Sequence, residues 1–219
     1  MIQAVFFDFD GLILDTEYPE FLAWKETFDR HGCLLALETW VAHLGKGAGN
    51  ATFSPYEELE AQLGCSIKRD VVRTAKRQRF SELMRDQALL PGIEARLEEA
   101  LQGGCKVGLV SSSPREWIEN YLRRFELVRA FDALFCGDEV AQTKPHPELY
   151  LKALSAFDVE AGQAIALEDS ANGIAAAKAA GLFCVAVPNR MTRYSCLDQA
   201  DLIIDSLADI TLQDLQGWI

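Results

Sequence analysis

The sequence has few of the residues that build nitrogen and sulfur metal centres or disulfide frameworks. Its 219 residues include three histidines and six cysteines, and no two cysteines form a C-x-x-C pair. The histidines are far apart in the chain, and several cysteines have apolar neighbours, as buried thiols do. This usage argues against a zinc site or a disulfide scaffold and favours a reducing compartment, so we expect a cytoplasmic protein.

Long apolar runs and an excess of basic residues are absent as well. No apolar run approaches the about 20 residues of a membrane-spanning helix, and no basic segment precedes a short apolar one as in a secretory signal. The 33 acidic residues outnumber the 21 basic ones, which gives a net charge of -12. Because this charge repels phosphate backbones and anionic lipid, we expect neither a nucleic acid nor a membrane as a partner.

The chain starts with an apolar segment that ends in carboxylates. Ala4 to Phe7 are strand formers, and Asp8 and Asp10 follow before Gly11. A short apolar run of this kind is typical of a buried parallel strand, and ligands of open α/β sheets bind outside the carboxyl ends of the strands. Alternation along the extended chain puts both aspartates on one side. We therefore expect them at the functional site, where their mutual repulsion favours a divalent cation.

The segment 16–88 is predicted to be helical, without strand-like runs. Phe21, Trp24 and Phe28 recur at the spacing of one buried helical face, and further amphipathic and charged stretches follow. Glycines within residues 45–49 interrupt the pattern with a loop that could approach a ligand closely. Since the segment lies between the first strand and the rest of the chain, we expect it to form a cap domain over the two aspartates.

From residue 89 onward, strand-like and helix-like segments alternate. The predicted strands cover residues 106–111, 133–136, 163–167, 183–187 and 201–204, with predicted helices between them. Such alternation is typical of a parallel sheet with right-handed crossovers and helices on both faces. We therefore predict an α/β protein in which residues 1–15 and 89–219 form the core domain and residues 16–88 form an inserted all-helical cap domain.

Polar residues follow further strands of the predicted sheet. Ser111 and Ser112 come after the second strand, Lys144 lies beyond the third, and Glu168 and Asp169 follow the fourth. Each of these residues alone would more often cap a helix or contact solvent. Because the carboxyl ends of parallel strands lie at one edge of the sheet, their occurrence after successive strands predicts one shared site with the two aspartates.

These residue types supply what phosphoryl transfer requires. A carboxylate can attack phosphorus and form an aspartyl phosphate, and a second carboxyl group can protonate the leaving group and then deprotonate water. Mg2+ held by acidic oxygens cancels the repulsion between nucleophile and phosphate, while an ammonium and a hydroxyl group bind the phosphoryl oxygens.

Each role can be assigned to particular residues. Asp8 is the predicted nucleophile and a metal ligand, and Asp10 is the predicted acid and base. Asp169, together with Glu168, completes the predicted metal site. The phosphate is expected to bind to the remaining polar residues at the strand ends, which are Ser111, Ser112 and Lys144.

Four stretches of the sequence resemble the motifs of the haloacid dehalogenase superfamily of phosphatases and phosphomutases. These are Asp8-Phe9-Asp10-Gly11, Ser111, Lys144-Pro145 and Glu168-Asp169-Ser170. Residues 8–16, followed by a helical insertion, are similar to the β-phosphoglucomutase-like branch of that superfamily. The resemblance implies a Rossmann-like core, a mobile helical cap, Mg2+ as the usual ion, and the backbone carbonyl of Asp10 as a further metal ligand.

The resemblance leaves both a phosphatase and a mutase open. A β-phosphoglucomutase grips its second phosphate with an arginine in the cap loop, whereas residues 45–49 contain Lys46 and no arginine. It also carries a histidine where Pro19-Glu20 stands here. We therefore predict an Mg2+-dependent phosphatase that acts on a small phosphorylated metabolite, with a sugar phosphomutase as the alternative.

Three other classes fit less well. A haloacid dehalogenase needs no metal and usually lacks the second aspartate, and a phospho-receiver domain is shorter and has no cap. A binding protein on a scaffold that has lost its activity would not be expected to keep every motif residue.

Several residues outside the motifs have open roles. Contact with the substrate and a role on the surface are both possible for four of them, which are Tyr18, Glu20, Lys46 and Arg115. Trp24 and Trp117 lie on apolar helical stripes and are expected in the core. The substrate does not follow from these residues, and a capped fold of this size is expected to work as a monomer.

Overall fold

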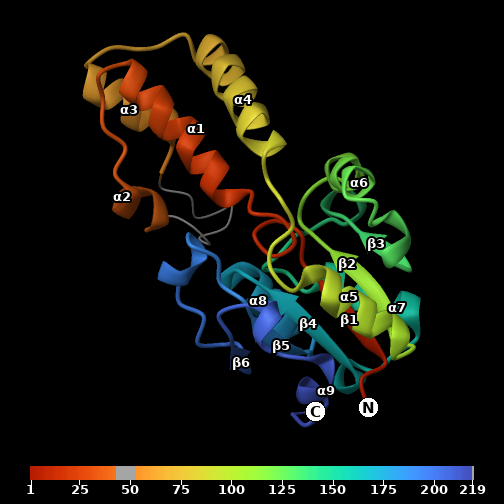
Figure 1. Cartoon of the computed structure of the whole chain (residues 1–219). Coiled ribbons are helices and arrows are strands. Elements are labelled where there is room, and N and C mark those ends of the chain that lie inside the picture. Colours follow the sequence, from red (N-terminus) through yellow and green to blue (C-terminus); the bar gives the residue numbers. More distant parts are fainter. Residues whose placement is uncertain (43–52, 219) are drawn as a thin grey trace.

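The computed structural model describes residues 1–42 and 53–218, and a six-stranded sheet lies at the centre of the protein (Figure 1). All its strand pairs are parallel. Across the sheet the strands are β3 (Ala133–Phe135), β2 (Lys106–Val110), β1 (Ala4–Phe7), β4 (Ala164–Glu168), β5 (Phe183–Ala186) and β6 (Leu202–Ile203). The predicted α/β class with a parallel sheet is confirmed, and each strand lies within one residue of its predicted bounds.

Helices cover both faces of the sheet because its central strands are apolar on both sides. Val5 and Phe7 of β1 point to one face, and Ala4 and Phe6 point to the other, as the two-residue period of a strand requires. The helices of the first face are α5 (Ile93–Gln102), α6 (Arg115–Arg124) and α9 (Leu212–Gln216). Those of the second are α7 (Glu148–Phe157) and α8 (Ala171–Ala179).

The register of the central strands brings their carboxyl ends to one level. Phe7 of β1 pairs with Leu109 of β2 on one side and with Leu167 of β4 on the other. The N–H group of Asp8 donates to the carbonyl of Leu167 at 3.0 Å. The residues that follow these three strands therefore lie next to one another, which positions the candidate site.

Among the described residues, four helices form a separate unit beside this edge of the sheet (Figure 1). They are α1 (Glu17–Arg30), α2 (Leu37–Val41), α3 (Pro55–Leu63) and α4 (Arg69–Arg85). Phe21, Trp24 and Phe28 of α1 are buried in the apolar cluster of this unit, as their spacing predicts. The glycine loop expected at residues 45–49, which contains Lys46, lies outside the described residues. In the part of the chain that the structure describes, no helix is long and apolar enough to span a membrane.

The two chain connections between the helical unit and the sheet run side by side. Leu14 forms a bridge with Leu89, and the N–H group of Leu90 donates to the carbonyl of Ile13 at 3.0 Å. The chain therefore enters and leaves the helical unit at one place, next to the end of β1.

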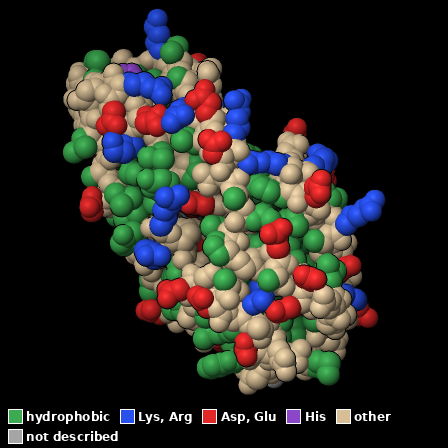
Figure 2. Space-filling view, viewed as in Figure 1, with side chains coloured by type: hydrophobic (Ala, Val, Ile, Leu, Met, Phe, Trp, Pro, Cys, Tyr) green, Lys and Arg blue, Asp and Glu red, His purple; other side chains and the backbone are tan. Residues whose placement is uncertain are grey.

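Acidic and basic side chains are interspersed over the outer surface of both units on the face shown in Figure 2.

Phe6→Ala is expected to lower the free energy of unfolding by about 3–5 kcal/mol, because a buried aromatic ring is lost and a cavity remains. Phe6 is fully buried, and its ring centroid lies 5.6 Å from that of Phe157 and 6.1 Å from that of Tyr150. Urea unfolding measures the loss. Leu151→Ala on α7 is the control, since Leu151 is 48% exposed and should cost less than about 0.5 kcal/mol. Similar losses in both variants would contradict the assignment of the core.

Candidate active site

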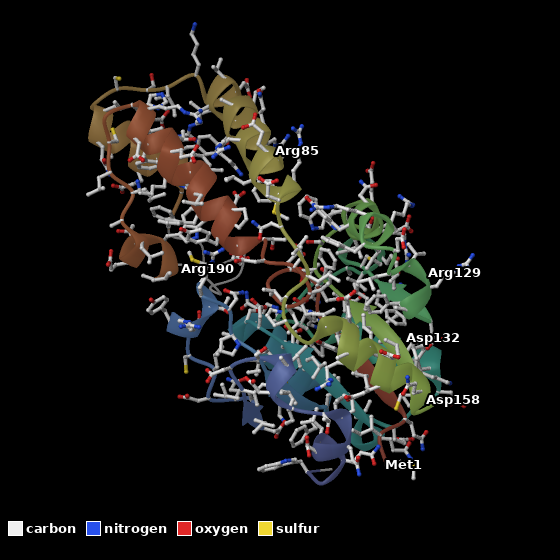
Figure 3. All side chains as sticks on the ribbon, in the orientation of Figure 1. Met1, Arg85, Arg129, Asp132, Asp158 and Arg190 are labelled. Atoms are coloured by element: carbon white, nitrogen blue, oxygen red, sulfur yellow. The ribbon has the colours of Figure 1, made fainter. Side chains whose placement is uncertain are left out.

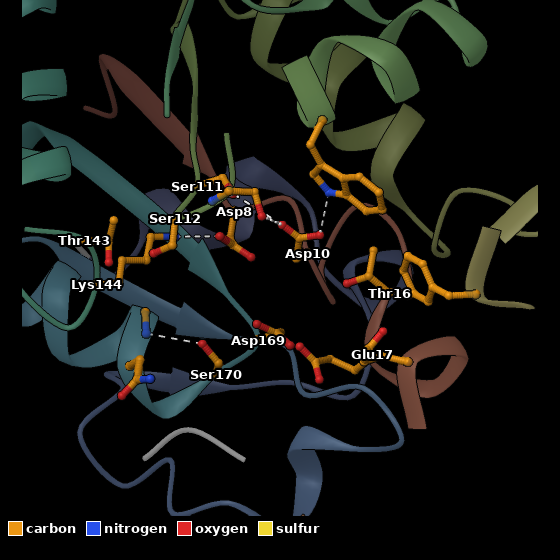
Figure 4. A pocket seen from close by; sticks show the side chains of 16 residues that line it. Asp8, Asp10, Thr16, Glu17, Ser111, Ser112, Thr143, Lys144, Asp169 and Ser170 are labelled. Atoms are coloured by element: carbon orange, nitrogen blue, oxygen red, sulfur yellow. Dashed lines mark hydrogen bonds and ion pairs between the residues drawn. The ribbon is translucent and has the colours of Figure 1, made fainter. Parts of the chain in front are cut away.

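A cavity of about 540 Å³ lies at the carboxyl ends of the strands, between the sheet and the helical unit (Figure 4). Of the site residues predicted from the sequence, all but Glu168 line it, and Glu168 is fully buried. The sheet side of the lining comes from the loops after β1, β2, β3 and β4. The opposite side comes from the start of α1, from Phe80 of α4 and from Trp117 of α6.

The ammonium group of Lys144 joins the ends of three strands. Its Nζ donates to Asp8 Oδ1 at 2.5 Å and to the carbonyl of Val110 at 2.7 Å, and it lies 2.6 Å from Glu168 Oε1. These three acceptors match the three donors of an ammonium group. Burial alone would lower the pKa of Lys144, but Asp8 and Glu168 outweigh burial and hold that pKa above its usual value. Lys144 therefore stays charged.

The carboxyl groups of Asp8, Glu168 and Asp169 outnumber the one positive charge of Lys144 beside them. Burial raises the pKa of Asp8 to about 8; Lys144 opposes this shift, and Glu168 and Asp10 add to it. Burial also raises the pKa of Asp169 well above its usual range, with further contributions from Asp8 and Glu168. Such shifts indicate that the cluster binds either a proton or a cation.

These carboxylates also have the geometry of a cation site. Oxygen atoms of Asp8, Glu168 and Asp169 all lie within 4.8 Å of one another. Glu168 Oε1 accepts from the hydroxyl group of Tyr150 at 2.5 Å, while the buried Oε2 has no hydrogen-bond partner among the described residues. A buried acceptor without a partner is costly, and carboxylate oxygens are preferred ligands of hard divalent cations. The residues present therefore fit a divalent cation.

Two glycines make room for these acids. A Cβ atom on Gly173 would lie 1.8 Å from Glu168 Oε2, and one on Gly11 would lie 2.1 Å from Asp169 Oδ2. Gly11 also has a φ of +89°, a backbone conformation that is unfavourable for residues with a Cβ atom. The turn after β1 and the start of α8 can therefore approach the acidic cluster only with glycine at these positions.

Asp10 has different surroundings from Asp8. Its Oδ2 accepts from the hydroxyl groups of Ser113 at 2.6 Å and Ser111 at 3.4 Å, and its Oδ1 accepts from Trp117 Nε1 at 3.0 Å (Figure 4). These donors come from the loop after β2 and from the first turns of α6. Asp8 is thus held by a buried ammonium group, and Asp10 by neutral donors beside the cavity.

Trp117 packs against the core, as predicted, but it also has a place in the candidate site. Its ring does pack on Phe80 and Tyr121, with centroids 5.9 Å and 4.7 Å away. However, its indole N–H group contacts Asp10 and it lines the cavity. The helical spacing shows that Trp117 lies on an apolar face, but not that this face meets the strand ends.

The helical unit contributes two carboxylates to the cavity. Glu17 is half-buried, and burial raises its pKa to about 7, with further contributions from Asp10, Glu20 and Asp15. Glu20 lines the cavity and accepts from Lys76 Nζ at 2.5 Å and from Trp24 Nε1 at 3.2 Å. The helical unit therefore adds one carboxylate that is paired with a lysine, Glu20, and one without a basic partner among the contacts of the described residues, Glu17.

The other candidates for substrate contact lie elsewhere. The ring of Tyr18 lies beneath the guanidinium group of Arg190, 3.4 Å from centroid to carbon, and is not part of the cavity lining. Arg115 binds Glu139 and the carbonyl of Leu134. Lys46 is outside the described residues.

The sequence analysis did not identify four residues that line the cavity or contact its acids, which are Glu17, Ser113, Tyr150 and Asn189. Asn189 Nδ2 donates to Asp169 Oδ2 at 2.8 Å. Asn189 follows β5, so the same search for polar residues after strands would have found it. Tyr150 sits on an apolar helical face, where no local signal marks its hydroxyl group.

Comparisons with known proteins identify the family of the chain. The family model described as "Haloacid dehalogenase-like hydrolase" matches residues 5–187. "Putative phosphatase YhcW" of Bacillus subtilis (strain 168) is 40% identical over 97% of this chain and 95% of that protein. "Phosphorylated carbohydrates phosphatase" of Thermotoga maritima is 31% identical over 83% of this chain and 82% of that protein.

Two solved structures share the whole fold. A variant of CbbY from Rhodobacter sphaeroides, in complex with xylulose-(1,5)-bisphosphate, has a TM-score of 0.73 and 31% identity over 98% of this chain and 99% of that chain. β-Phosphoglucomutase from Clostridium difficile has a TM-score of 0.72 and 28% identity over 99% of this chain and 96% of that chain. The predicted resemblance and the expectation of an enzyme are confirmed. The chain belongs to the haloacid dehalogenase-like hydrolase family.

Proposed function

We propose that the protein is an Mg2+-dependent phosphatase that hydrolyses a small phosphomonoester through an aspartyl phosphate on Asp8. The observation that carries this proposal is the difference between two neighbouring aspartates. Asp8 is buried against Lys144, and Asp10 is held by hydroxyl and indole donors in the same cavity. Carboxyl groups in unlike surroundings can take the unlike roles of nucleophile and acid-base catalyst.

In the first step, a carboxylate oxygen of Asp8 attacks phosphorus and the bond from phosphorus to the leaving oxygen breaks. Asp10 gives its proton to the leaving oxygen, which departs as an alcohol. Lys144 turns one of its three donors from a protein acceptor to the phosphoryl group, and it binds the phosphoryl oxygens together with the hydroxyl groups of Ser111 and Ser112. Because charge spreads over those oxygens in the transition state, these donors lower the barrier.

In the second step, water attacks the phosphorus of the aspartyl phosphate and the bond from phosphorus to Asp8 breaks, which releases inorganic phosphate. Asp10 accepts the proton of that water. Hydrogen bonds from Ser111, Ser113 and Trp117 hold its carboxyl group at the wall of the cavity, where the water would lie.

The ion of this proposal would be held by Asp8, Asp169 and Glu168, with the backbone carbonyl of Asp10 as a further ligand. The close approach of three acidic side chains and the unpartnered Glu168 Oε2 support this assignment. When bound, Mg2+ supplies positive charge that offsets the repulsion between the carboxylates and the phosphate.

A phosphatase fits the cavity better than the alternative, a sugar phosphomutase. A mutase needs a second phosphate site, and among the described lining residues Lys144 is the one basic side chain. On the side of the helical unit, Glu17 would repel a second phosphate group, and Glu20 is already paired with Lys76. Lys46, which could serve a mutase, lies outside the described residues.

The substrate and setting complete the proposal. One relative is named for phosphorylated carbohydrates and one similar structure contains a sugar bisphosphate, so phosphorylated sugars and polyols are the first class to screen. Residues 16–88 would act as the cap that covers the substrate. A capped fold of this size can work as a monomer, and the six free thiols support a cytoplasmic setting.

Asp8→Asn is expected to lower phosphate release from sugar phosphates and from 4-nitrophenyl phosphate by roughly a thousandfold or more, because an amide cannot form the intermediate. A colorimetric phosphate assay with Mg2+ measures this. Asp10→Asn is the matched variant, which should slow turnover while Mg2+ affinity stays within about twofold, since its proposed metal contact is the backbone. Turnover by Asp8→Asn near that of the unsubstituted protein would exclude Asp8 as the nucleophile.

Mg2+ is expected to bind more tightly at pH 8 than at pH 6. Without metal, the pKa of Asp8 is raised from 3.8 to about 8. The proton on Asp8 therefore stabilises the folded protein fully below pH 3.8, and this stabilisation is lost as the pH rises through about 8. Mg2+ must displace this proton, which weakens binding by up to about tenfold for each pH unit below 8. Calorimetric titration at pH 6, 7 and 8 measures the affinity.

The same linkage makes the rise in melting temperature with Mg2+, relative to a chelator, larger at pH 8 than at pH 6. Asp8→Asn should show a weaker pH dependence, because it lacks this titrating group. An affinity for Mg2+ that is independent of pH in the unsubstituted protein would contradict the assignment of Asp8 as a ligand.

A further inference from the structure

The loop after β5 reaches the acidic cluster through one side chain. Asn189 Nδ2 donates to Asp169 Oδ2 at 2.8 Å and to the carbonyl of Gly11 at 3.1 Å. A Cβ atom on Gly11 would lie 2.7 Å from this Nδ2. The turn after β1, the carboxylate of Asp169 and the amide of Asn189 are therefore in tight contact.

The orientation of the Asn189 amide is determined by its own loop. Its Oδ1 accepts from the backbone N–H groups of Met191 at 2.8 Å and Thr192 at 3.0 Å. Its backbone N–H group donates to Thr192 Oγ1 at 3.1 Å. Because the oxygen end is occupied by two donors, the NH2 end faces Asp169, and the hydrogen-bonding capacity of the amide is filled.

The next two residues of the loop contact the helical unit. Arg190 pairs with Asp15 at 3.0 Å from Nε to Oδ2 and lies over the ring of Tyr18, at the boundary between the two units (Figure 3). Met191 is 1% exposed and belongs to the apolar cluster that contains Phe21. Three consecutive residues thus contact the acidic cluster, the hinge of the helical unit and its core.

We propose that Asn189 is a positioning residue for the metal ligand Asp169, and that the segment Asn189–Met191 makes this positioning depend on the docking of the helical unit. The inference rests on the proposed Mg2+ site. An N–H group held against one carboxylate oxygen restricts the rotation of the whole carboxylate, so less order must be gained when the cation binds. Outer partners of this kind commonly affect metal affinity by roughly tenfold to a hundredfold.

Asn189→Ala is expected to raise the dissociation constant for Mg2+ by roughly tenfold to a hundredfold. Calorimetric titration of the metal-free full-length protein with MgCl2, without substrate, measures it. Thr192→Val is the matched control, because it removes the acceptor of the Asn189 backbone N–H group in the same loop and leaves the side-chain amide. Its dissociation constant should stay within about twofold. Equal weakening in both variants would reduce Asn189 to a structural role and overturn the inference.

The link to the helical unit has its own test. Met191→Ala should raise the same dissociation constant by a smaller factor, because the loop loses its anchor. The double variant Asn189→Ala/Met191→Ala should bind Mg2+ no more weakly than Asn189→Ala alone, since the anchor acts through the amide. Additive effects of the two substitutions would show that the loop does not transmit docking to Asp169.

Failure of this inference is distinguishable from failure of the proposed function. If the unsubstituted protein binds no Mg2+, the proposed cation and this inference are both wrong. If it binds Mg2+ and Asn189→Ala binds it equally well, the inference alone is wrong and the phosphatase proposal stands.

Discussion

The contact of Lys144 with Asp8 and Glu168 is the interaction on which the site depends. Three acids are buried together at one edge of the sheet, and a buried carboxylate without compensation would cost several kcal/mol. Lys144 balances part of this charge, while burial, together with the remaining negative charge, raises the pKa of Asp8 and of Asp169. Such a cluster would only destabilise an ordinary core, but in this cavity it could bind a cation, as the proposed phosphatase requires.

The sheet satisfies this requirement through its register. Strands β1, β2 and β4 end at one level, so the residues that follow them come together without long loops. Glycine at positions 11 and 173 lets the backbone approach the acids where a Cβ atom would collide with their carboxylate oxygens. The proposed catalytic groups are therefore held at the ends of buried strands, where little freedom would remain to be lost when a substrate binds.

The helical unit does more than line one side of the cavity. It brings Glu17 and Phe80 to the lining, while Trp117 of the core contacts both Phe80 and Asp10. Arg190 and Met191 also join the helical unit to the loop that contacts Asp169. The helical unit is thus linked to Asp10 and Asp169 through residues of the core, so a change in its docking would alter the surroundings of the proposed active site.

The local pattern of the sequence determined the strands, the helical insertion and the acids at the strand ends. The burial of β1 and of the apolar face of α1 follows from the spacing of apolar residues along the chain. The roles of Trp117, Glu17, Tyr150 and Asn189 were decided by tertiary structure. Each lies on an element whose periodicity or turn looks ordinary, and its function depends on which distant group it meets. The spacing of residues along the chain predicts which face of its helix or strand a side chain lies on. Which distant group it contacts is determined only by the packing of the whole fold.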